Sequence, residues 1–199
     1  MLARKSFRLG EFKLSSGGAS DYYVDCRATT LDAEGIRLTA RTFLDELYRR
    51  GWTPQAVGGP TLGADPIAVG MAMLTAQQVQ ERRPVGGRQQ DAEAWLIHAF
   101  LVRKGEKTHG TGQRIEGFRE KGARVVIVED VCTTGKSLSE AIAAARACGF
   151  DVIGVMCLVE REDAGGRPRV EQAAAPAPFV SLFTASEIRA EHLRLHNGQ

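Results

Sequence analysis

The 199-residue sequence has few cysteines, little net charge and no long hydrophobic run. Its four cysteines form no C-x-x-C pair, so the spacing typical of metal-thiolate and redox sites is missing, and free thiols in a reducing cytosol are expected. The 26 basic and 24 acidic side chains leave a net charge of +2, which is too small to favour nucleic acid or an anionic membrane as the main partner. Apolar runs extend for only a few residues, and Met1–Leu14 lacks the apolar segment of a secretory signal, so neither a membrane span nor secretion is expected.

The composition and the apolar periodicity indicate one globular α/β domain covering residues 1–199. Hydrophobic residues make up 43% of the chain and charged residues 25%, which excludes disorder, collagen and coiled coil as the main description. Apolar runs alternate with amphipathic segments, which predicts a parallel sheet flanked by helices. Strands are predicted at 56–60, 94–102, 123–128, 152–159 and 179–183, and helices at 32–50, 66–79, 137–148 and 184–195. The Gly- and Ser-rich segment 7–27 predicts a small β-rich hood contributed mainly by residues 1–30, while 103–120 and 164–178 are expected to be irregular.

The segment Val125–Ser137, with the sequence VVIVEDVCTTGKS, carries the clearest chemical signal. A buried strand is predicted to end at the adjacent carboxylates Glu129 and Asp130, and a short loop of small residues then leads into a helix. Ligands of open α/β sheets bind beyond the carboxyl ends of the strands, and the unpaired N–H groups of a helix N-terminus suit a phosphate. Gly135 lets the backbone approach such a ligand closely.

A nucleotide P-loop is the competing interpretation, because Gly135-Lys136-Ser137 matches the last positions of that motif. The motif requires another glycine five residues earlier, where Asp130 stands. Carboxylates would repel a triphosphate, but they readily accept hydrogen bonds from hydroxyl groups. The expected ligand therefore carries a sugar diol beside a single phosphate.

Val125–Ser137 resembles the phosphoribosyl-pyrophosphate (PRPP) signature of the type I phosphoribosyltransferases. Phe12–Asp25 (FKLSSGGASDYYVD) is similar to the N-terminal signature of the orotate phosphoribosyltransferases, and Arg103–Gly110 (RKGEKTHG) to their mobile catalytic loop. Gly59–Pro66 matches a further family segment, and Leu158–Arg161 places Arg161 where the family has the arginine that contacts orotate. The resemblance covers nearly the whole chain and implies a Rossmann-like parallel sheet with flanking helices and an N-terminal hood.

The resemblance also implies a reaction, in which the 5-phosphoribosyl group passes from PRPP to N1 of orotate and gives orotidine 5′-monophosphate and pyrophosphate in pyrimidine (UMP) biosynthesis. The implied cofactor is Mg²⁺ carried by PRPP or pyrophosphate, with no metal ligand assigned to the protein, and the implied assembly is a cytoplasmic homodimer that shares the catalytic loop. The implied catalytic residues are Arg103, Lys104, Lys107, His109 and Asp130. The implied PRPP site comprises Arg103, Lys104, Lys107, His109, Glu129, Asp130, Val131, Cys132, Thr133, Thr134, Gly135, Lys136 and Ser137. The implied orotate site comprises Tyr23, Val24, Thr133 and Arg161.

Two departures from the family pattern concern charge, because many members have lysine where Ser15 and Gly63 stand here. Either another cation replaces that charge or binding is weaker. Two alternatives to the orotate reaction also stay open: a type I phosphoribosyltransferase for another base, such as a purine, and a non-catalytic PRPP-sensing regulator. The low net charge and the intact loop motif weigh against the regulator.

Smaller expectations concern single side chains. Tyr22 and Tyr23 are expected mainly to pack, with one of them lining the base site. Cys132 has no accompanying His/Asn constellation and is not expected to be a nucleophile. His98 is expected in the core, and His192 and His196 on the surface.

Overall fold

The computed structural model describes residues 1–13, 19–81, 96–105 and 114–197. Ser15, Lys107 and His109 lie outside these residues, as do residues 82–91, whose proline and glycines predict a loop. Within the described part of the chain, no helix is long and apolar enough to cross a membrane.

Six strands form the central sheet in the order β5-β4-β3-β6-β7-β8. All neighbouring pairs are parallel except β4 and β5, which are antiparallel at one edge. The bounds are β3 Ala56–Pro60, β4 His98–Val102, β5 Ile115–Gly117, β6 Arg124–Cys132, β7 Asp151–Glu160 and β8 Phe179–Thr184. The predicted α/β architecture with a mainly parallel sheet is confirmed.

Strand β6 lies in the middle of the sheet because its valine-rich sequence is apolar on both faces. Val126 and Val128 pack into one hydrophobic cluster, and Val125 and Ile127 pack into the other. Side chains alternate across a strand, so a continuous apolar run supplies both faces. The residues that follow the run are thereby held at the carboxyl edge of the sheet.

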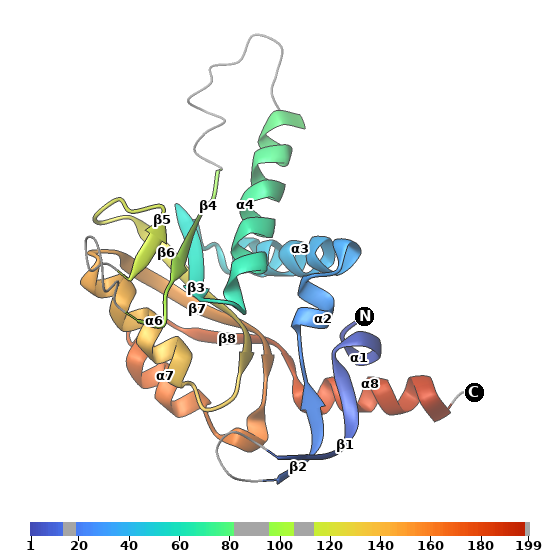
Figure 1. Cartoon of the computed structure of the whole chain (residues 1–199). Helices are drawn as coiled ribbons and strands as arrows, with labels where there is room; N and C mark the ends of the chain where they lie inside the picture. Colours follow the sequence, from blue (N-terminus) through green and yellow to red (C-terminus); the bar gives the residue numbers. More distant parts are fainter. Residues whose placement is uncertain (14–18, 82–95, 106–113, 198–199) are drawn as a thin grey trace.

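Helices cover both faces of the sheet (Figure 1). On one face lie α3 (Ala33–Arg50) and α4 (Ala64–Glu81), and on the other lie α6 (Lys136–Ala147) and α7 (Arg167–Ala174). The predicted ends of α3 are confirmed, since the Asp32 side chain accepts a hydrogen bond from the Gly35 amide at 2.9 Å and Gly51 ends the helix at φ 66°.

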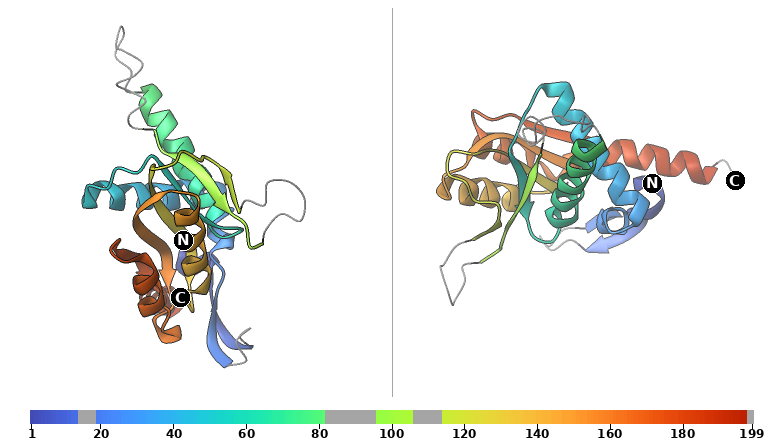
Figure 2. Two further views of the ribbon diagram at one scale, coloured as in Figure 1. Left: turned by 90° about the vertical axis from the view of Figure 1, so that its left-hand side faces the viewer. Right: turned by 90° about the horizontal axis from the view of Figure 1, so that it is seen from above.

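The hood consists of a two-stranded antiparallel hairpin, β1 (Phe7–Lys13) and β2 (Ala19–Val24), which projects to one side of the central sheet (Figure 2). Short helices α1 (Leu2–Lys5) and α2 (Arg27–Thr30) flank it, and the C-terminal helix α8 (Ala185–Asn197) packs on α1. The spacing of Thr184 and Glu187 predicts a capping box at the start of α8, and the structure confirms it: the Thr184 amide donates to Glu187 at 2.7 Å, and the Glu187 amide donates to Thr184 Oγ1 at 3.2 Å.

Two segments that were expected to be irregular contain regular structure. Ile115–Gly117 forms β5, because buried Ile115 pairs with Val102 at the sheet edge; three residues are too few to show a strand pattern. Arg167–Ala174 forms α7, with a proline in its first turn and Val170 and Ala174 buried one turn apart. The 3₁₀ turn η1 (Glu162–Ala164) precedes it.

Four further expectations need correction. The strand expected at 94–102 begins at His98, and β6 continues past the predicted end at Val128 as far as Cys132, because Val131 and Cys132 pair with β7. His98 is exposed, with its ring stacked on Phe118 at 5.0 Å, since this first residue of β4 projects beside the edge strand and not into the core. His192 is half-buried, because its Nδ1 lies 2.7 Å from the Ala3 carbonyl oxygen, whereas His196 is exposed as expected.

Candidate active site

A cavity of about 620 Å³ opens at the carboxyl ends of β3 and β6, under the hood. It joins the hood to the sheet edge, so residues far apart in the sequence meet in one space. Its lining comprises Lys13, Tyr23, Val24, Asp25, Cys26, Arg27, Pro60, Thr61, Leu62, Gly63, Lys104, Glu129, Asp130, Val131, Thr133, Thr134, Ser137 and Arg161. The structure therefore gathers most of the predicted site residues that it describes around one cavity.

Glu129 and Asp130 form the acidic side of the cavity. Glu129 is only 5% exposed, and its Oε1 accepts the Asp130 amide at 3.2 Å, while Asp130 Oδ1 accepts the Val131 amide at 2.8 Å. No ion pair joins either carboxylate to a lysine or arginine within the described part of the chain. Their oxygens are thus available to accept hydrogen bonds from hydroxyl groups of a ligand.

The pKa values of the two acids reflect this burial. Burial first, and the neighbouring Asp130 second, raise the pKa of Glu129 well above its usual range. Burial also raises the pKa of Asp130, although hydrogen bonds and the nearby Arg27 charge oppose the shift. Without a ligand, the protein therefore does not fully stabilise the ionised forms of these two carboxyl groups.

The unfavourable burial of the ionised Glu129 carboxylate predicts that Glu129→Gln raises the melting temperature of the ligand-free protein at neutral pH. Because the folded-state pKa of Glu129 lies above the unfolded value of about 4.3, its contribution to stability is full below that value and is lost as the pH rises through the folded pKa. Glutamine has no proton to lose, so the advantage of the variant should grow with pH over this window. Thermal unfolding from about pH 4 to pH 8 measures it.

The matched control is Glu160→Gln, at the end of the neighbouring strand. Glu160 is equally buried, but it pairs with Arg167, whose Nε lies 2.9 Å from Glu160 Oε1. Its replacement should lower the melting temperature, because the pair is broken. A Glu129→Gln variant that is less stable than the wild type at pH 8 would contradict the interpretation.

The loop from Thr133 to Ser137 forms the opposite side of the cavity. Thr133, Thr134 and Ser137 line it, and Gly135 precedes α6 in the left-handed conformation, at φ 72°. A Cβ at Gly135 would lie 2.7 Å from the Gly166 carbonyl oxygen, so only glycine fits there. No side chain caps the N-terminus of α6, so its first N–H groups can serve an anion.

Three predicted PRPP contacts have side chains that do not line the cavity. Lys136 is exposed and lies 3.9 Å from Glu140, one turn further along α6. The Cys132 side chain is buried away from the cavity. Arg103 lies at the base of the predicted catalytic loop, where it pairs with Glu116 at 3.6 Å, while neighbouring Lys104 reaches the cavity.

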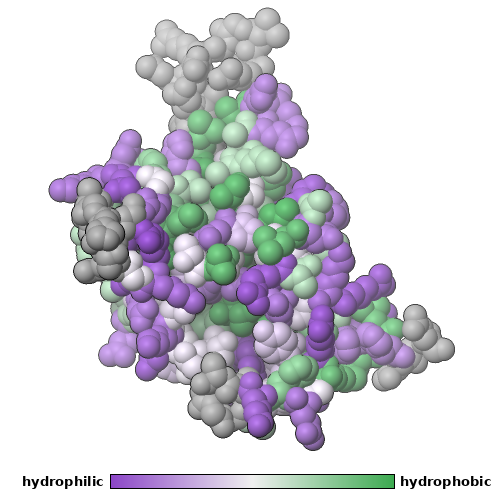
Figure 3. Space-filling model, viewed as in Figure 1, coloured by the Kyte–Doolittle hydropathy of each residue, from purple (hydrophilic) through white to green (hydrophobic). Residues whose placement is uncertain are grey.

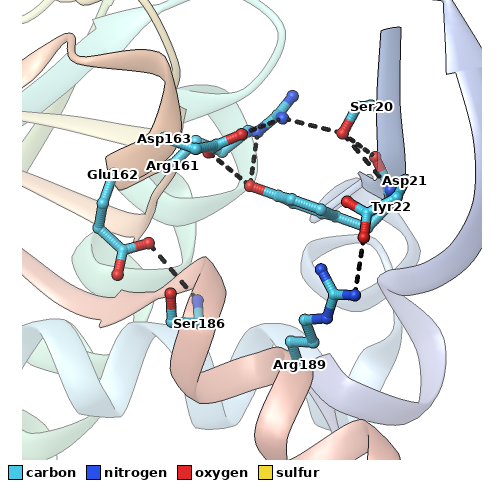
Figure 4. A network of polar contacts seen from close by, with 8 residues as sticks. All are labelled: Ser20, Asp21, Tyr22, Arg161, Glu162, Asp163, Ser186 and Arg189. Atoms are coloured by element: carbon cyan, nitrogen blue, oxygen red, sulfur yellow. Dashed lines mark hydrogen bonds and ion pairs between the residues drawn. The ribbon is translucent and has the colours of Figure 1, made fainter.

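The predicted base-binding residues meet at the hood end of the cavity. Tyr23 is exposed and lines it, with its ring 5.4 Å from Phe12, whereas Tyr22 is buried and packs as expected. Arg161 is only 6% exposed, yet it also lines the cavity. Figure 4 shows its guanidinium held among Ser20, Tyr22 and Asp163.

Lys13 and Arg27 are cationic lining residues that the sequence motifs do not predict. Arg27 is held by Asp25 through two hydrogen bonds, at 2.8 and 3.0 Å. Lys13 lies in the N-terminal signature and Arg27 two residues beyond it, but neither has a spacing that marks it as a ligand contact. Their place in the cavity follows from the folding of the hood over the sheet.

Gly63 faces the two carboxylates directly. A Cβ added there would collide with Asp130 Oδ1, and it would also meet Glu129 Oε1 at 2.5 Å. A lysine at this position would require both carboxylates to move. Glycine at 63 is therefore matched to the arrangement of Glu129 and Asp130 in this protein.

The comparison with known proteins agrees with this geometry. A family model described as phosphoribosyl transferase domain matches residues 40–174, so the fold and the site define the class of the phosphoribosyltransferases. The chain is 39% identical over 191 residues to the orotate phosphoribosyltransferase of Aquifex aeolicus, which covers 94% of this chain and 93% of the relative. It is 40% identical over 179 residues to that of Streptomyces avermitilis, covering 90% of this chain and 88% of the relative.

A solved structure extends the likeness to the fold. The crystal structure of Mycobacterium tuberculosis orotate phosphoribosyltransferase in complex with PRPP matches with a TM-score of 0.68 at 32% identity, covering 94% of this chain and 93% of that chain. The chain therefore belongs to the orotate phosphoribosyltransferase family. The family that the sequence motifs predicted is thereby confirmed.

Proposed function

We propose that this protein transfers the 5-phosphoribosyl group of PRPP to N1 of orotate, giving orotidine 5′-monophosphate and pyrophosphate, as a step of pyrimidine biosynthesis. One observation carries the proposal: a single cavity combines a carboxylate pair, a helix N-terminus suited to phosphate and a buried arginine, in a chain of this family. These three features match the diol, the 5′-phosphate and the carboxylated base of the two substrates.

The geometry supports a division of roles along the cavity. Glu129 and Asp130 accept hydrogen bonds from the 2′ and 3′ hydroxyls of the ribose, and the Thr133–Ser137 loop binds the 5′-phosphate. Orotate lies toward Tyr23, Val24 and Arg161, where the guanidinium pairs with its carboxylate. C1′ is then placed between the base and the departing pyrophosphate.

Charge develops on the pyrophosphate as its bond to C1′ breaks. Arg103, Lys104, Lys107 and His109 are the proposed cations that stabilise it, and Lys104 already lines the cavity. Lys13 and Arg27 supply positive charge on the hood side. We propose that these two residues take over the role of the lysines that many relatives carry at positions 15 and 63.

The proposed cofactor is Mg²⁺. Within residues 1–13, 19–81, 96–105 and 114–197, no group of three or more His, Cys, Asp or Glu side chains is arranged to hold a metal. Mg²⁺ commonly keeps several waters and binds through one or two carboxylates plus substrate phosphates. Glu129 and Asp130 fit that mode: together with the phosphates of PRPP they would hold the Mg²⁺, which would supply positive charge to the pyrophosphate.

The proposed assembly is a homodimer, built on the outer face of α4. Val69 is 57% exposed and Met73 59% exposed, one turn apart, and Leu62 precedes the helix at the cavity. Figure 3 shows hydrophobic side chains gathered on the face that carries α4. A second copy seated there would lie beside the cavity, as a shared catalytic loop requires.

The double substitution Val69→Asp with Met73→Asp is expected to convert the dimer to monomers and to lower activity strongly, because it puts charge into an apolar contact. Sedimentation together with a rate assay measures both effects. Leu31→Asp is the control, since Leu31 is 73% exposed on a different element and should leave the dimer intact. A double variant that stays dimeric and active would contradict this choice of interface.

The decisive test of the reaction is the loss of orotate absorbance in the presence of PRPP and Mg²⁺. Turnover with a purine base but not with orotate would reject the substrate assignment in favour of the purine alternative. A PRPP-dependent shift of nucleic acid without turnover of any base would favour the regulator. A cytoplasmic location stays a prediction from the sequence.

A further inference from the structure

The side chain of Arg161 is held by partners from two distant parts of the chain (Figure 4). Its Nε donates to the Tyr22 hydroxyl at 3.1 Å, and its Nη2 donates to Asp163 Oδ2 at 2.8 Å and to Ser20 Oγ at 3.2 Å. The Tyr22 hydroxyl in turn donates to Asp163 Oδ1 at 2.5 Å. These bonds form a closed triangle of Arg161, Tyr22 and Asp163.

Ring packing fixes the same guanidinium from a second direction. Its central carbon lies 4.6 Å from the centre of the Tyr22 ring, and that ring is stacked on Phe7 at 5.3 Å with an angle of 15° between the planes. The plane and the rotation of the guanidinium are therefore both determined before any ligand arrives.

The network leaves one nitrogen of Arg161 free. Nη1 has no hydrogen-bond partner among the residues that the structure describes, and in Figure 4 it points away from Tyr22 and Asp163. Arg161 also lines the cavity. The protein thus uses the Nε and Nη2 side of the guanidinium internally and keeps the Nη1 side for a ligand.

We propose that Tyr22 and Asp163 are positioning residues that orient Arg161, so that its free side meets the carboxylate of the base and selects carboxylated pyrimidines. This inference rests on the proposed function, because it assumes that Arg161 contacts orotate. An arginine loses rotamer freedom when it binds, and a guanidinium that is already held loses less. The same contacts should therefore improve both affinity for orotate and discrimination against bases without a carboxylate.

The protonation of the triangle supports this role. Burial first, and the hydrogen bond to Asp163 second, raise the pKa of Tyr22 to about 12, so the hydroxyl keeps the proton that it donates. Burial alone would raise the pKa of Asp163, but hydrogen bonds from Tyr22 and Arg161 outweigh it and lower the pKa. The three groups thus keep one donor–acceptor pattern at neutral pH.

Tyr22→Phe is the principal test, because it preserves the ring stack and every formal charge and removes only the hydroxyl. The KM for orotate is expected to rise about tenfold, equivalent to about 1.4 kcal/mol, while the KM for PRPP and the melting temperature change little. The preference for orotate over uracil, the same ring without the carboxylate, should fall by a similar factor.

The matched control is Asp21→Asn, on the neighbouring residue of the same strand. Asp21 ties the hood to α8 through an ion pair with Arg189 at 2.7 Å, and it does not bond Arg161. If Tyr22 merely attached the hood, both variants would raise the KM values of both substrates, and the proposal would be overturned.

Two further variants separate this proposal from the proposed function. Asp163→Asn should also raise the KM for orotate; a lower value would mean that Asp163 only masks the charge of Arg161, which would overturn the proposal. In an Arg161→Lys background, where the KM for orotate is already high, Tyr22→Phe should add nothing. Wild-type protein without orotate turnover would reject the proposed function itself, whereas an active wild type with an unaffected Tyr22→Phe variant would reject only the positioning role.

Discussion

Replacing Lys107 with alanine is expected to lower kcat by about 100- to 1000-fold while leaving the KM for orotate nearly unchanged, the range found when one preorganised charge stabiliser is removed. Lys107 lies outside the described residues, and its role follows from its place in the RKGEKTHG segment. The charge that it would neutralise grows on pyrophosphate only as the bond to C1′ breaks. The loss should therefore appear in the transition state and not in the binding of the base.

Steady-state kinetics with orotate and with PRPP varied separately measure this effect. Lys121→Ala is the control, because Lys121 is an exposed lysine in the turn that precedes β6, at the opposite end of that strand from the cavity. A Lys107→Ala variant with unchanged kcat and a raised KM would assign Lys107 to uniform substrate binding instead. An unchanged rate and an unchanged KM would remove it from the mechanism.

Gly135→Ala is expected to have the other large effect, on both PRPP binding and stability. At φ 72°, a side chain costs about 1–2 kcal/mol in backbone strain. The new Cβ would also lie 2.7 Å from both the Gly166 carbonyl oxygen and Val170 Cγ2, and such overpacking costs about 1–3 kcal/mol more. The loop must shift to relieve this contact, so the KM for PRPP should rise at least about tenfold as bonds to the phosphate lengthen.

Gly122→Ala separates the effect of backbone strain from the effect of crowding around the new Cβ. Gly122 has nearly the same backbone conformation, at φ 77°, but a Cβ there would meet nothing within 4 Å. This variant should be destabilised only by the backbone strain, and its KM for PRPP should not change. Thermal unfolding and PRPP titration of both variants make the comparison, and equal behaviour of the two would show that crowding at the phosphate loop is unimportant.

The segment from Val125 to Ser137 could be predicted closely because its signals are local. A continuous apolar run marks a buried strand, and a glycine followed by a new periodicity marks the start of a helix. Even here the boundary was misplaced: β6 continues to Cys132, because pairing with β7 extends the strand through both carboxylates. The backbone therefore holds Glu129 and Asp130 within a ladder and not in a loop.

The cations and the arginine network depend on contacts that no local pattern contains. Tyr22 and Arg161 are separated by 139 positions, and Lys13 and Arg27 reach the cavity only because the hairpin folds over the carboxyl edge of the sheet. Periodicity reports which face of an element is buried, but it carries no information about which distant residue lies opposite.

The sequence alone thus predicted the order of the secondary-structure elements, the phosphate-binding turn and the protein family. Each of these depends on residues that are adjacent in the sequence. Packing between segments far apart in the sequence decided three other features. It determined how the hood covers the site, which side of Arg161 stays free, and why glycine and not lysine fits at position 63. Such contacts form only when the chain is folded, because the side chains that make them are brought together by the sheet and its covering helices and not by their spacing.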